Sequence, residues 1–230
     1  MTWRGSLYVT GTDTEIGKTV ASCALLHALR ARGCRAVGMK PVASGSETQP
    51  DGTCRNEDAL ALLAASDPRP DYELVNPYAL PVPTAPELAA RQAGVELRLE
   101  PMLAAYAMLA AQADAVVVEG VGGWQAPLTE ALDQADVARA MALPVVLVVG
   151  IRLGCVNHAR LSARAILDQG FALRGWIGNH VQPDMLCAGD TVGILHRVLP
   201  APCLGVLPWM PSPDPAVLAA ALDVSRLVPA

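Results

Sequence analysis

The sequence predicts an α/β fold with a doubly wound, mostly parallel sheet and helices on both faces. Apolar runs of strand length alternate with stretches of helical spacing, which is typical of sheets built from strand-helix units. The runs are continuously apolar, as expected of strands buried on both faces. The chain has 230 residues and 52% hydrophobic content, enough for the core of a single domain over residues 1–230.

The expected elements follow the chain in order. Six apolar runs predict strands, at residues 6–11, 36–42, 114–120, 144–150, 173–179 and 203–209. Helical spacing predicts helices over 17–32, 100–113, 131–142 and 156–169. Residues 67–86 contain six prolines, so we expect a long loop without a regular helix or a central strand.

Composition excludes several classes of protein. Charged residues make up 17% of the chain and the net charge is −5, which argues against nucleic acid as a partner and favours a small one. No apolar run reaches the roughly 18–20 residues that span a bilayer, and the start "MTWRGSLYVTG" lacks the pattern of a signal peptide. We therefore expect a cytoplasmic protein without a membrane partner. The six cysteines form no C-x-x-C pair and are expected to be small buried residues.

The stretch "GTDTEIGKT" at residues 11–19 is close to a phosphate-binding loop. Five residues separate Gly11 from Gly17, one more than in the G-x-x-x-x-G-K-[ST] pattern. The stretch follows a predicted strand and leads into a predicted helix, which is the context that the motif requires. Backbone N–H groups and Lys18 could therefore hold a polyphosphate, and Thr19 could offer its hydroxyl to Mg²⁺.

Lysine usage points to the same region. The chain has 17 lysine and arginine residues, and the only two lysines are Lys18 and Lys40. Arginine evidently serves wherever a generic positive charge is enough. The two exceptions are predicted to lie where a compact ammonium group is needed.

Two acidic residues are candidates for a metal site, whereas the histidines are not. Glu119 closes an apolar run before "GVGGW", which suits a Mg²⁺ ligand, although a solvated carboxylate at a strand end is the alternative. Asp58 in "RNEDALALLAA" is by itself typical of the acidic first turn of a helix. None of the histidines has metal-ligand spacing or the setting of a nucleophile's partner: His27, His158, His180 and His196.

The candidate residues share a position relative to the predicted strands. Ligands of open parallel sheets bind at the carboxyl ends of the strands. Residues at or just after such ends are Gly11, Lys40, Glu119, Gly150, Asn179 and Pro208. The predicted architecture therefore places a nucleotide site where the motif does.

Together these residues carry a resemblance that extends along nearly the whole chain. The loop with one extra residue is similar to the variant phosphate loop of the dethiobiotin synthetase family, which has the phosphate-loop NTPase fold. The segments that carry the resemblance are "VTGTDTEIGKTVASCALL", "KPVASGS", "RNEDALAL", "VNPY", "VEGVGGW", "LPVVLVVGIRLGCVNHA" and "PAPCLGVLPW".

The resemblance implies an activity, a cofactor and partners. Enzymes of this family use ATP as co-substrate, Mg²⁺ and CO₂ to close a ureido ring on diaminopelargonic acid, in the penultimate step of biotin synthesis. One amine captures CO₂ as a carbamate, the carbamate attacks the γ-phosphate, and the second amine displaces phosphate from the mixed anhydride. The resemblance also implies a homodimer with the substrate site at the subunit interface.

The resemblance also implies roles for individual residues. Lys40 would be the catalytic lysine, and Thr19, Asp58 and Glu119 would surround magnesium. Substrate would contact Ser44, Gly154 and Asn157, the last two at a helix N-terminus that faces the partner subunit. The nucleotide would contact Glu15, Ile16, Gly17, Lys18, Thr19, Val20, Asp58, Glu119, Gly120, Val121, Gly122, Asn179, His180, Leu207, Pro208 and Trp209.

Two residues depart from the family pattern. Val121 stands where a small alanine is more common in the "EGxGG" turn, which is expected to narrow the turn. His180 follows Asn179 where an acid is frequent, and is expected to weaken base selectivity unless it is simply a surface residue.

Two other classes of ATP-dependent protein are alternatives to this family. A partitioning or cell-division switch ATPase has the same fold, but such proteins usually carry a lysine near the start of the loop, where this chain has "GTDTE". They also carry an amphipathic membrane tail, which "DVSRLVPA" does not resemble. A cobyrinate amidase would need a glutaminase domain that 230 residues cannot accommodate.

Overall fold

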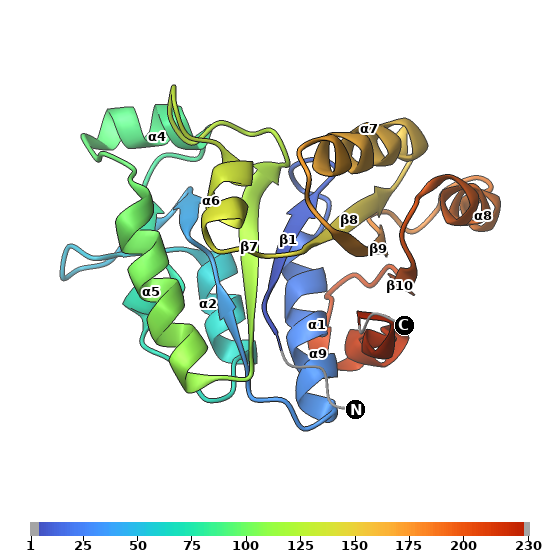
Figure 1. Cartoon of the computed structure of the whole chain (residues 1–230), viewed down its shortest axis with the longest axis horizontal. Helices are drawn as coiled ribbons and strands as arrows, with labels where there is room; N and C mark the ends of the chain where they lie inside the picture. Colours follow the sequence, from blue (N-terminus) through green and yellow to red (C-terminus); the bar gives the residue numbers. More distant parts are fainter. Residues whose placement is uncertain (1–4, 228–230) are drawn as a thin grey trace.

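A parallel sheet forms the centre of the protein in the computed structural model, which describes residues 5–227 (Figure 1). The strand order is β10-β9-β8-β1-β7-β2, and every neighbouring pair is parallel. The strands are β1 (Leu7–Gly11), β2 (Ala36–Met39), β7 (Ala115–Gly123), β8 (Val145–Ile151), β9 (Leu173–His180) and β10 (Cys203–Leu207). All six predicted strands are confirmed. The ends of "MTWRGSLYVTG" and "DVSRLVPA", residues 1–4 and 228–230, lie outside the described residues.

Helices cover both faces of this sheet, which confirms the predicted fold class (Figure 1). One face packs against α1 (Lys18–Ala31), α2 (Glu57–Ala65) and α9 (Pro215–Leu218), followed by the short helices η1 (Ala219–Ala221) and η2 (Val224–Leu227). The other packs against α5 (Leu99–Gln112), α6 (Gln134–Ala140), α7 (Cys155–Asp168) and α8 (Ala188–Val198). The four predicted helices are confirmed as α1, α5, α6 and α7 with slightly different ends.

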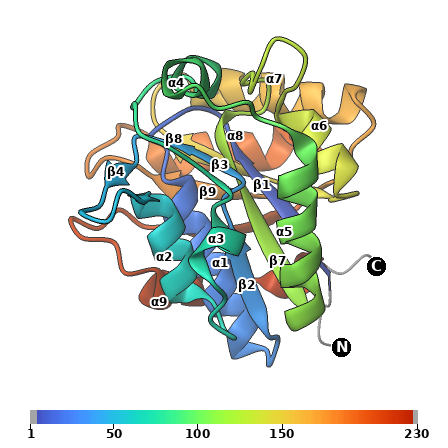
Figure 2. The same cartoon turned by 90° about the vertical axis from the view of Figure 1, so that its left-hand side faces the viewer.

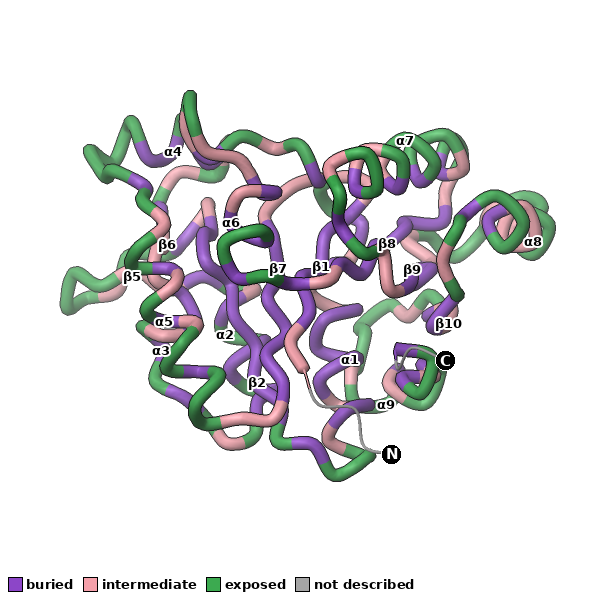
Figure 3. The backbone as a smooth tube through the Cα atoms, viewed as in Figure 1, coloured by how far each residue is buried: buried purple, intermediate pink, exposed green. Residues whose placement is uncertain are grey.

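The strand side chains explain why the sheet is covered on both sides. Alternate residues of β8 enter opposite cores: Val145, Leu147 and Val149 pack on one face, and Val146 and Val148 on the other. Figure 3 shows the strands as the buried centre of the molecule, with exposed stretches on the outer helices. A continuous apolar run is therefore the strand pattern that this architecture requires.

The register of the sheet aligns the strand ends. Val9 of β1 pairs with Glu119 of β7, and Met39 of β2 pairs with Val118. Lys40 therefore leaves β2 beside Glu119. On the other half of the sheet, Asn179 of β9 pairs with Leu207 of β10 and with Gly150 of β8.

The proline-rich segment 67–86 is more ordered than the sequence predicted. It contains α3 (Tyr72–Val75) and β6 (Tyr78–Leu80), and its last residue begins α4 (Pro86–Ala93). The prolines lie outside these elements or, in Pro86, at the first position of a helix, where no N–H is needed. No central strand lies in this segment, as predicted, but the expectation of a loop without a helix was wrong because the prolines separate short elements.

Small sheets accompany this segment near the carboxyl ends of the main strands. Strand β6 pairs in parallel with β3 (Val42–Ser44), and β4 (Glu47–Thr48) pairs with β5 (Cys54–Arg55) in an antiparallel hairpin. Figure 2 shows α4 at the same end of the molecule. The sequence did not predict these strands, nor helices α4 and α8.

Surface properties agree in part with the composition. Within residues 5–227, no helix has the length and apolarity needed to cross a bilayer. Four of the six cysteines are buried as expected, whereas Cys54 is partly exposed and Cys187 is exposed.

Candidate active site

The loop between β1 and α1 has the geometry of a phosphate cradle. Glu15 and Gly17 have positive φ angles of 57° and 77°, and Gly17 is the N-cap of α1. The side-chain amide of Asn179 donates a hydrogen bond of 2.9 Å to the carbonyl of Ile16 and so ties the loop to β9. The N-terminus of a 14-residue helix therefore opens onto this loop.

Gly17 is required for both the conformation and the packing of the loop. A Cβ atom there would lie 2.1 Å from Nδ2 of Asn179. We expect Gly17→Ala to weaken ATP binding by at least about 100-fold in isothermal titration calorimetry, since the loop must move away from the phosphates. Gly33→Ala is the matched control: its φ is 81° and its Cβ would meet nothing within 4 Å. Equal ATP affinities in the two variants would contradict this prediction.

Lys18 is held close to the loop. Its Nζ donates to the Asp13 carbonyl at 2.7 Å, and the side chain of Asp13 in turn forms an ion pair with Arg152. Burial, aided by the charge of Lys40, lowers the pKa of Lys18 to about 8. An anion bound in the cradle would stabilise the positive charge of this buried ammonium.

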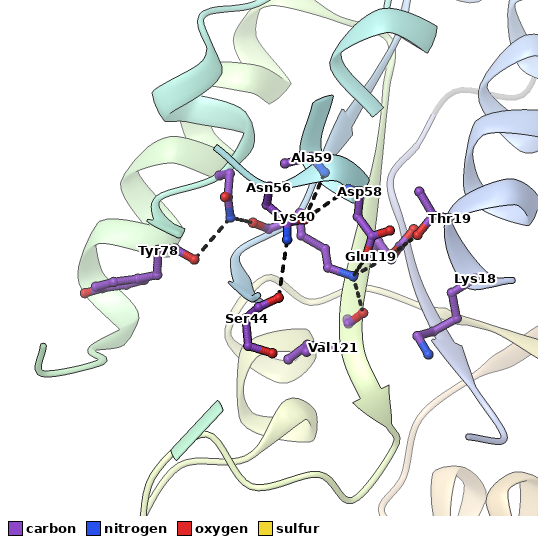
Figure 4. A network of polar contacts seen from close by, with 12 residues as sticks. Lys18, Thr19, Lys40, Ser44, Asn56, Asp58, Ala59, Tyr78, Glu119 and Val121 are labelled. Carbon is purple, nitrogen blue, oxygen red and sulfur yellow. Dashed lines mark hydrogen bonds and ion pairs between the residues drawn. The ribbon is translucent and has the colours of Figure 1, made fainter. Parts of the chain in front are cut away.

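Lys40 lies at the centre of a buried charge cluster (Figure 4). Its Nζ donates to Glu119 Oε1 at 2.6 Å, Asp58 Oδ2 at 3.1 Å and the Gly120 carbonyl at 3.2 Å. The residue is 3% exposed. Burial alone would lower the pKa of Lys40, but the carboxylates of Glu119 and Asp58 outweigh it and raise the pKa.

Thr19, Asp58 and Glu119 form a set of oxygen donors next to Lys40. The Thr19 hydroxyl donates to Glu119 Oε1 at 2.8 Å. Burial opposes ionisation of Asp58, but the Lys40 charge, the nearby Thr19 hydroxyl and the hydrogen bond from Lys40 bring its pKa below the usual value. Glu119 is fully buried, and its Oε2 has no hydrogen-bond partner among the described residues.

This donor set fits Mg²⁺. No group of three His, Cys, Asp or Glu side chains within residues 5–227 forms a complete metal site. Magnesium, however, commonly binds through one or two carboxylates, with phosphate oxygens and water completing the shell. The unpartnered oxygen of Glu119, the ionised Asp58 and the Thr19 hydroxyl can supply the protein's share.

Two adjoining cavities open from this cluster. The first has a volume of about 440 Å³ and is lined by Gly17, Lys18, Thr19, Val20, Lys40, Ser44, Asp58, Val121 and Gly122, among others. The second, of about 610 Å³, shares Glu15, Ser44, Asp58, Val121 and Gly122 with it and extends to Pro83–Pro86 before α4. The two volumes can hold a polyphosphate beside a second, elongated molecule.

A third cavity lies on the far side of the phosphate loop. It measures about 180 Å³ and is lined by Glu15, Gly17, Val20, Asn179, His180, Pro208 and Trp209, among others. Trp209 is 40% exposed, which excludes a role as a core aromatic, whereas Leu207 is buried in the core and does not line the cavity. A nucleotide base could stack here while its phosphates reach the cradle.

Gly154 and Asn157 do not join these cavities. Gly154 is the N-cap of α7 with a φ of 89°, and Asn157 lines a separate hollow of about 550 Å³ between α7 and the residues that follow α8. The neighbouring Leu153 is 93% exposed. Neither residue lines the cavities that contain Lys40, Ser44 or the phosphate loop.

Comparisons with known proteins agree with the site geometry. A family described as an AAA domain matches residues 5–217. The ATP-dependent dethiobiotin synthetase BioD of Xanthomonas euvesicatoria is 62% identical over 221 residues, 96% of this chain and 98% of that protein. The chain belongs to the dethiobiotin synthetase family. Another similar relative, the dethiobiotin synthetase of Xylella fastidiosa, is 59% identical over 94% of this chain and 96% of that protein.

Solved structures resemble this member of the dethiobiotin synthetase family in fold alone. The MinC:MinD cell division protein complex of Aquifex aeolicus aligns with a TM-score of 0.58 at 14% identity, over 97% of this chain and 94% of that one. FtsY of Elizabethkingia anophelis, in complex with GDP, aligns with a TM-score of 0.51 at 14% identity. The alignment covers 94% of this chain and 60% of that one. This dethiobiotin synthetase therefore shares its fold with a cell division protein and a signal recognition particle receptor.

The family departures occupy defined places. Val121 lines both large cavities, and its carbonyl accepts a hydrogen bond of 2.9 Å from Gln134. His180 lines the small cavity beside Asn179. The sequence missed Thr14 and the Pro83–Pro86 wall, although the length of the proline-rich segment was a usable signal for a functional loop.

Proposed function

We propose that this chain catalyses the ATP-dependent closure of a ureido ring on diaminopelargonic acid with CO₂, which yields dethiobiotin. The observation that carries the proposal is the ammonium of Lys40, which is buried between Glu119 and Asp58 in the wall of the 440 Å³ cavity that contains the phosphate loop. The family relationship supplies the choice of substrate.

The chain's own groups divide the work of binding. Lys18 and the backbone of residues 15–20 would hold the phosphates, with Val121 and Gly122 lining the same cavity and Gly120 next to them in the chain. Asn179 and His180 would contact the base, with Pro208 and Trp209 lining its pocket and the backbone of Leu207 leading into it. Mg²⁺ held by Thr19, Asp58 and Glu119 would neutralise charge on the phosphates.

The reaction then needs positioning and charge stabilisation more than covalent help. One substrate amine adds to CO₂ and loses a proton, which gives a carbamate. A carbamate oxygen attacks the γ-phosphorus as the bond to ADP breaks, and Lys40 stabilises the negative charge that gathers between them. The second amine attacks the carbamoyl carbon, releases phosphate and a proton, and closes the ring. Ser44, at the junction of the two cavities, would orient the reacting end.

We also propose that the whole chain is one ATP-binding domain that works as a homodimer. Gly154 and Asn157 stand at the N-terminus of α7 and line neither of the two large cavities, and we propose that they bind the distal carboxylate of a substrate held in the partner's active site. The exposure of Leu153 beside them is in keeping with a surface that a second subunit covers.

The decisive experiment measures phosphate release from Mg-ATP and bicarbonate with and without diaminopelargonic acid. We expect release to depend on the diamine and mass spectrometry to detect the ureido product. Equal ATP turnover without the diamine would overturn the proposal and favour a switch ATPase.

A further inference from the structure

The backbone of Lys40 is held by a segment more than thirty residues away. The N–H of Lys40 donates to the carbonyl of Val75 at 2.7 Å, and the side-chain amide of Asn76 donates to the carbonyl of Lys40, also at 2.7 Å. Asn76 is buried at the end of α3. Both peptide groups of Lys40 are therefore fixed by the Val75–Asn76 pair rather than by a neighbouring strand.

The same asparagine begins a chain of hydrogen bonds that reaches Asp58. The Tyr72 hydroxyl donates to Asn76 Oδ1 at 3.0 Å and accepts from the backbone N–H of Asn56 at 2.8 Å. Asn56 is the N-cap of α2, and its Oδ1 accepts from the N–H of Asp58 at 3.1 Å. The helix that carries Asp58 is thus tied through Tyr72 to the residue that holds Lys40.

Asn56 also contacts Ser44, which lines both large cavities. Its side-chain amide donates to the Ser44 carbonyl at 3.3 Å, as Figure 4 shows. The polar groups of Asn56 therefore set both the start of α2 and the strand on which Ser44 lies.

These contacts close into a ring. From the carbonyl of Lys40, hydrogen bonds connect Asn76, Tyr72 and Asn56 in turn to the backbone of Asp58. The Asp58 carboxylate closes the ring by its contact of 3.1 Å with the ammonium of Lys40. Asn56, Tyr72 and Asn76 are buried, and a satisfied buried network is rigid. A lysine side chain has four rotatable bonds, so fixing its backbone and its ammonium together restricts where the charge can lie.

We infer that Asn76 and Tyr72 are positioning residues that hold the Lys40 ammonium in register with Asp58. The inference rests on the proposed function of Lys40, and neither residue touches the substrate. A shift of about 1 Å in a catalytic group can cost about 100-fold in rate. Loss of the Tyr72 hydroxyl or the Asn76 amide is therefore expected to lower the rate of turnover without changing the phosphate loop.

The test compares Tyr72→Phe and Asn76→Ala with the control Tyr78→Phe. Tyr78 belongs to the same segment, and its hydroxyl accepts from the N–H of Arg98 at 3.2 Å, outside the ring. We expect kcat for dethiobiotin formation to fall about 10- to 100-fold in the first two variants, with KM for ATP within about twofold of wild type. The control should keep the wild-type kcat.

A purely structural role predicts a different result. It would lower the unfolding temperature but leave kcat per ATP-binding protomer unchanged, and that outcome overturns the inference. Tyr72→Phe is also combined with Lys40→Arg: if Tyr72 acts through Lys40, the second change costs little further rate, whereas a full multiplicative loss counts against it. Should Asn76→Ala fail to fold, Tyr72→Phe alone decides.

The wild-type protein separates this inference from the proposed function. If the wild type makes no dethiobiotin, the proposed function falls and the inference falls with it. If the wild type is active and Tyr72→Phe is equally active, the inference alone is overturned.

Discussion

Replacing Lys40 with arginine is expected to reduce turnover by about 100- to 1,000-fold while the protein stays folded. The ammonium fits between Glu119 Oε1 at 2.6 Å and Asp58 Oδ2 at 3.1 Å, in a site only 3% exposed. A guanidinium keeps the charge but is planar and wider, and its donors are spread over several nitrogen atoms. It therefore cannot contact both carboxylates and the transferred phosphoryl group from a single point, as an ammonium can. The measurement is kcat for dethiobiotin formation, together with thermal unfolding.

The matched control is the reverse exchange at the surface. Arg35 is exposed and forms an ion pair with the partly buried Asp114 at 3.3 Å, at the amino-terminal side of β2 and so at the opposite end of that strand from Lys40. Arg35→Lys should leave turnover unchanged. Near-normal turnover of Lys40→Arg would remove Lys40 from the chemistry.

Glu119→Gln is expected to raise the Mg²⁺ concentration for half-maximal ATP turnover about tenfold or more. The change removes the negative charge from the side-chain oxygen that has no hydrogen-bond partner within residues 5–227 and is available to the metal. It also weakens the hydrogen bond from Lys40, which should cost about 2 kcal/mol of unfolding free energy. A magnesium titration at fixed ATP and a urea unfolding curve measure the two effects separately.

Glu100→Gln serves as the control for that experiment. Glu100 forms an exposed ion pair with Arg98 at 3.5 Å on α5, and its loss should leave both the magnesium titration and the unfolding curve within error. An unchanged magnesium titration in Glu119→Gln would reduce Glu119 to a structural partner of Lys40.

The sequence predicted those parts of the fold in which local pattern and tertiary role coincide. A strand such as Val145–Ile151 is apolar at every position because both of its faces are covered. The apolar run in the sequence therefore directly indicates that the strand is buried. The phosphate loop was recognisable because Gly17 and Lys18 serve a local conformation. Both signals survive in a single sequence.

The missed features depend on contacts between distant residues. Prolines at 67–86 predicted an irregular loop, yet β6 pairs with β3 across more than thirty residues, and no local pattern encodes that pairing. Asp58 alone was typical of a helix cap, and it does stand in the first turn of α2. Its contact with Lys40 follows from the packing of α2 near the end of β2, which the sequence does not show.

The scarcity of lysine has a practical consequence for chemical labelling. The two lysine side chains are 7% and 3% exposed, and both face the same cavity. Reagents that acylate or reductively alkylate primary amines therefore find almost no lysine target on the outer surface. Any lysine modification of the native protein reports on the interior of this cavity, and its suppression by an added molecule measures occupancy directly.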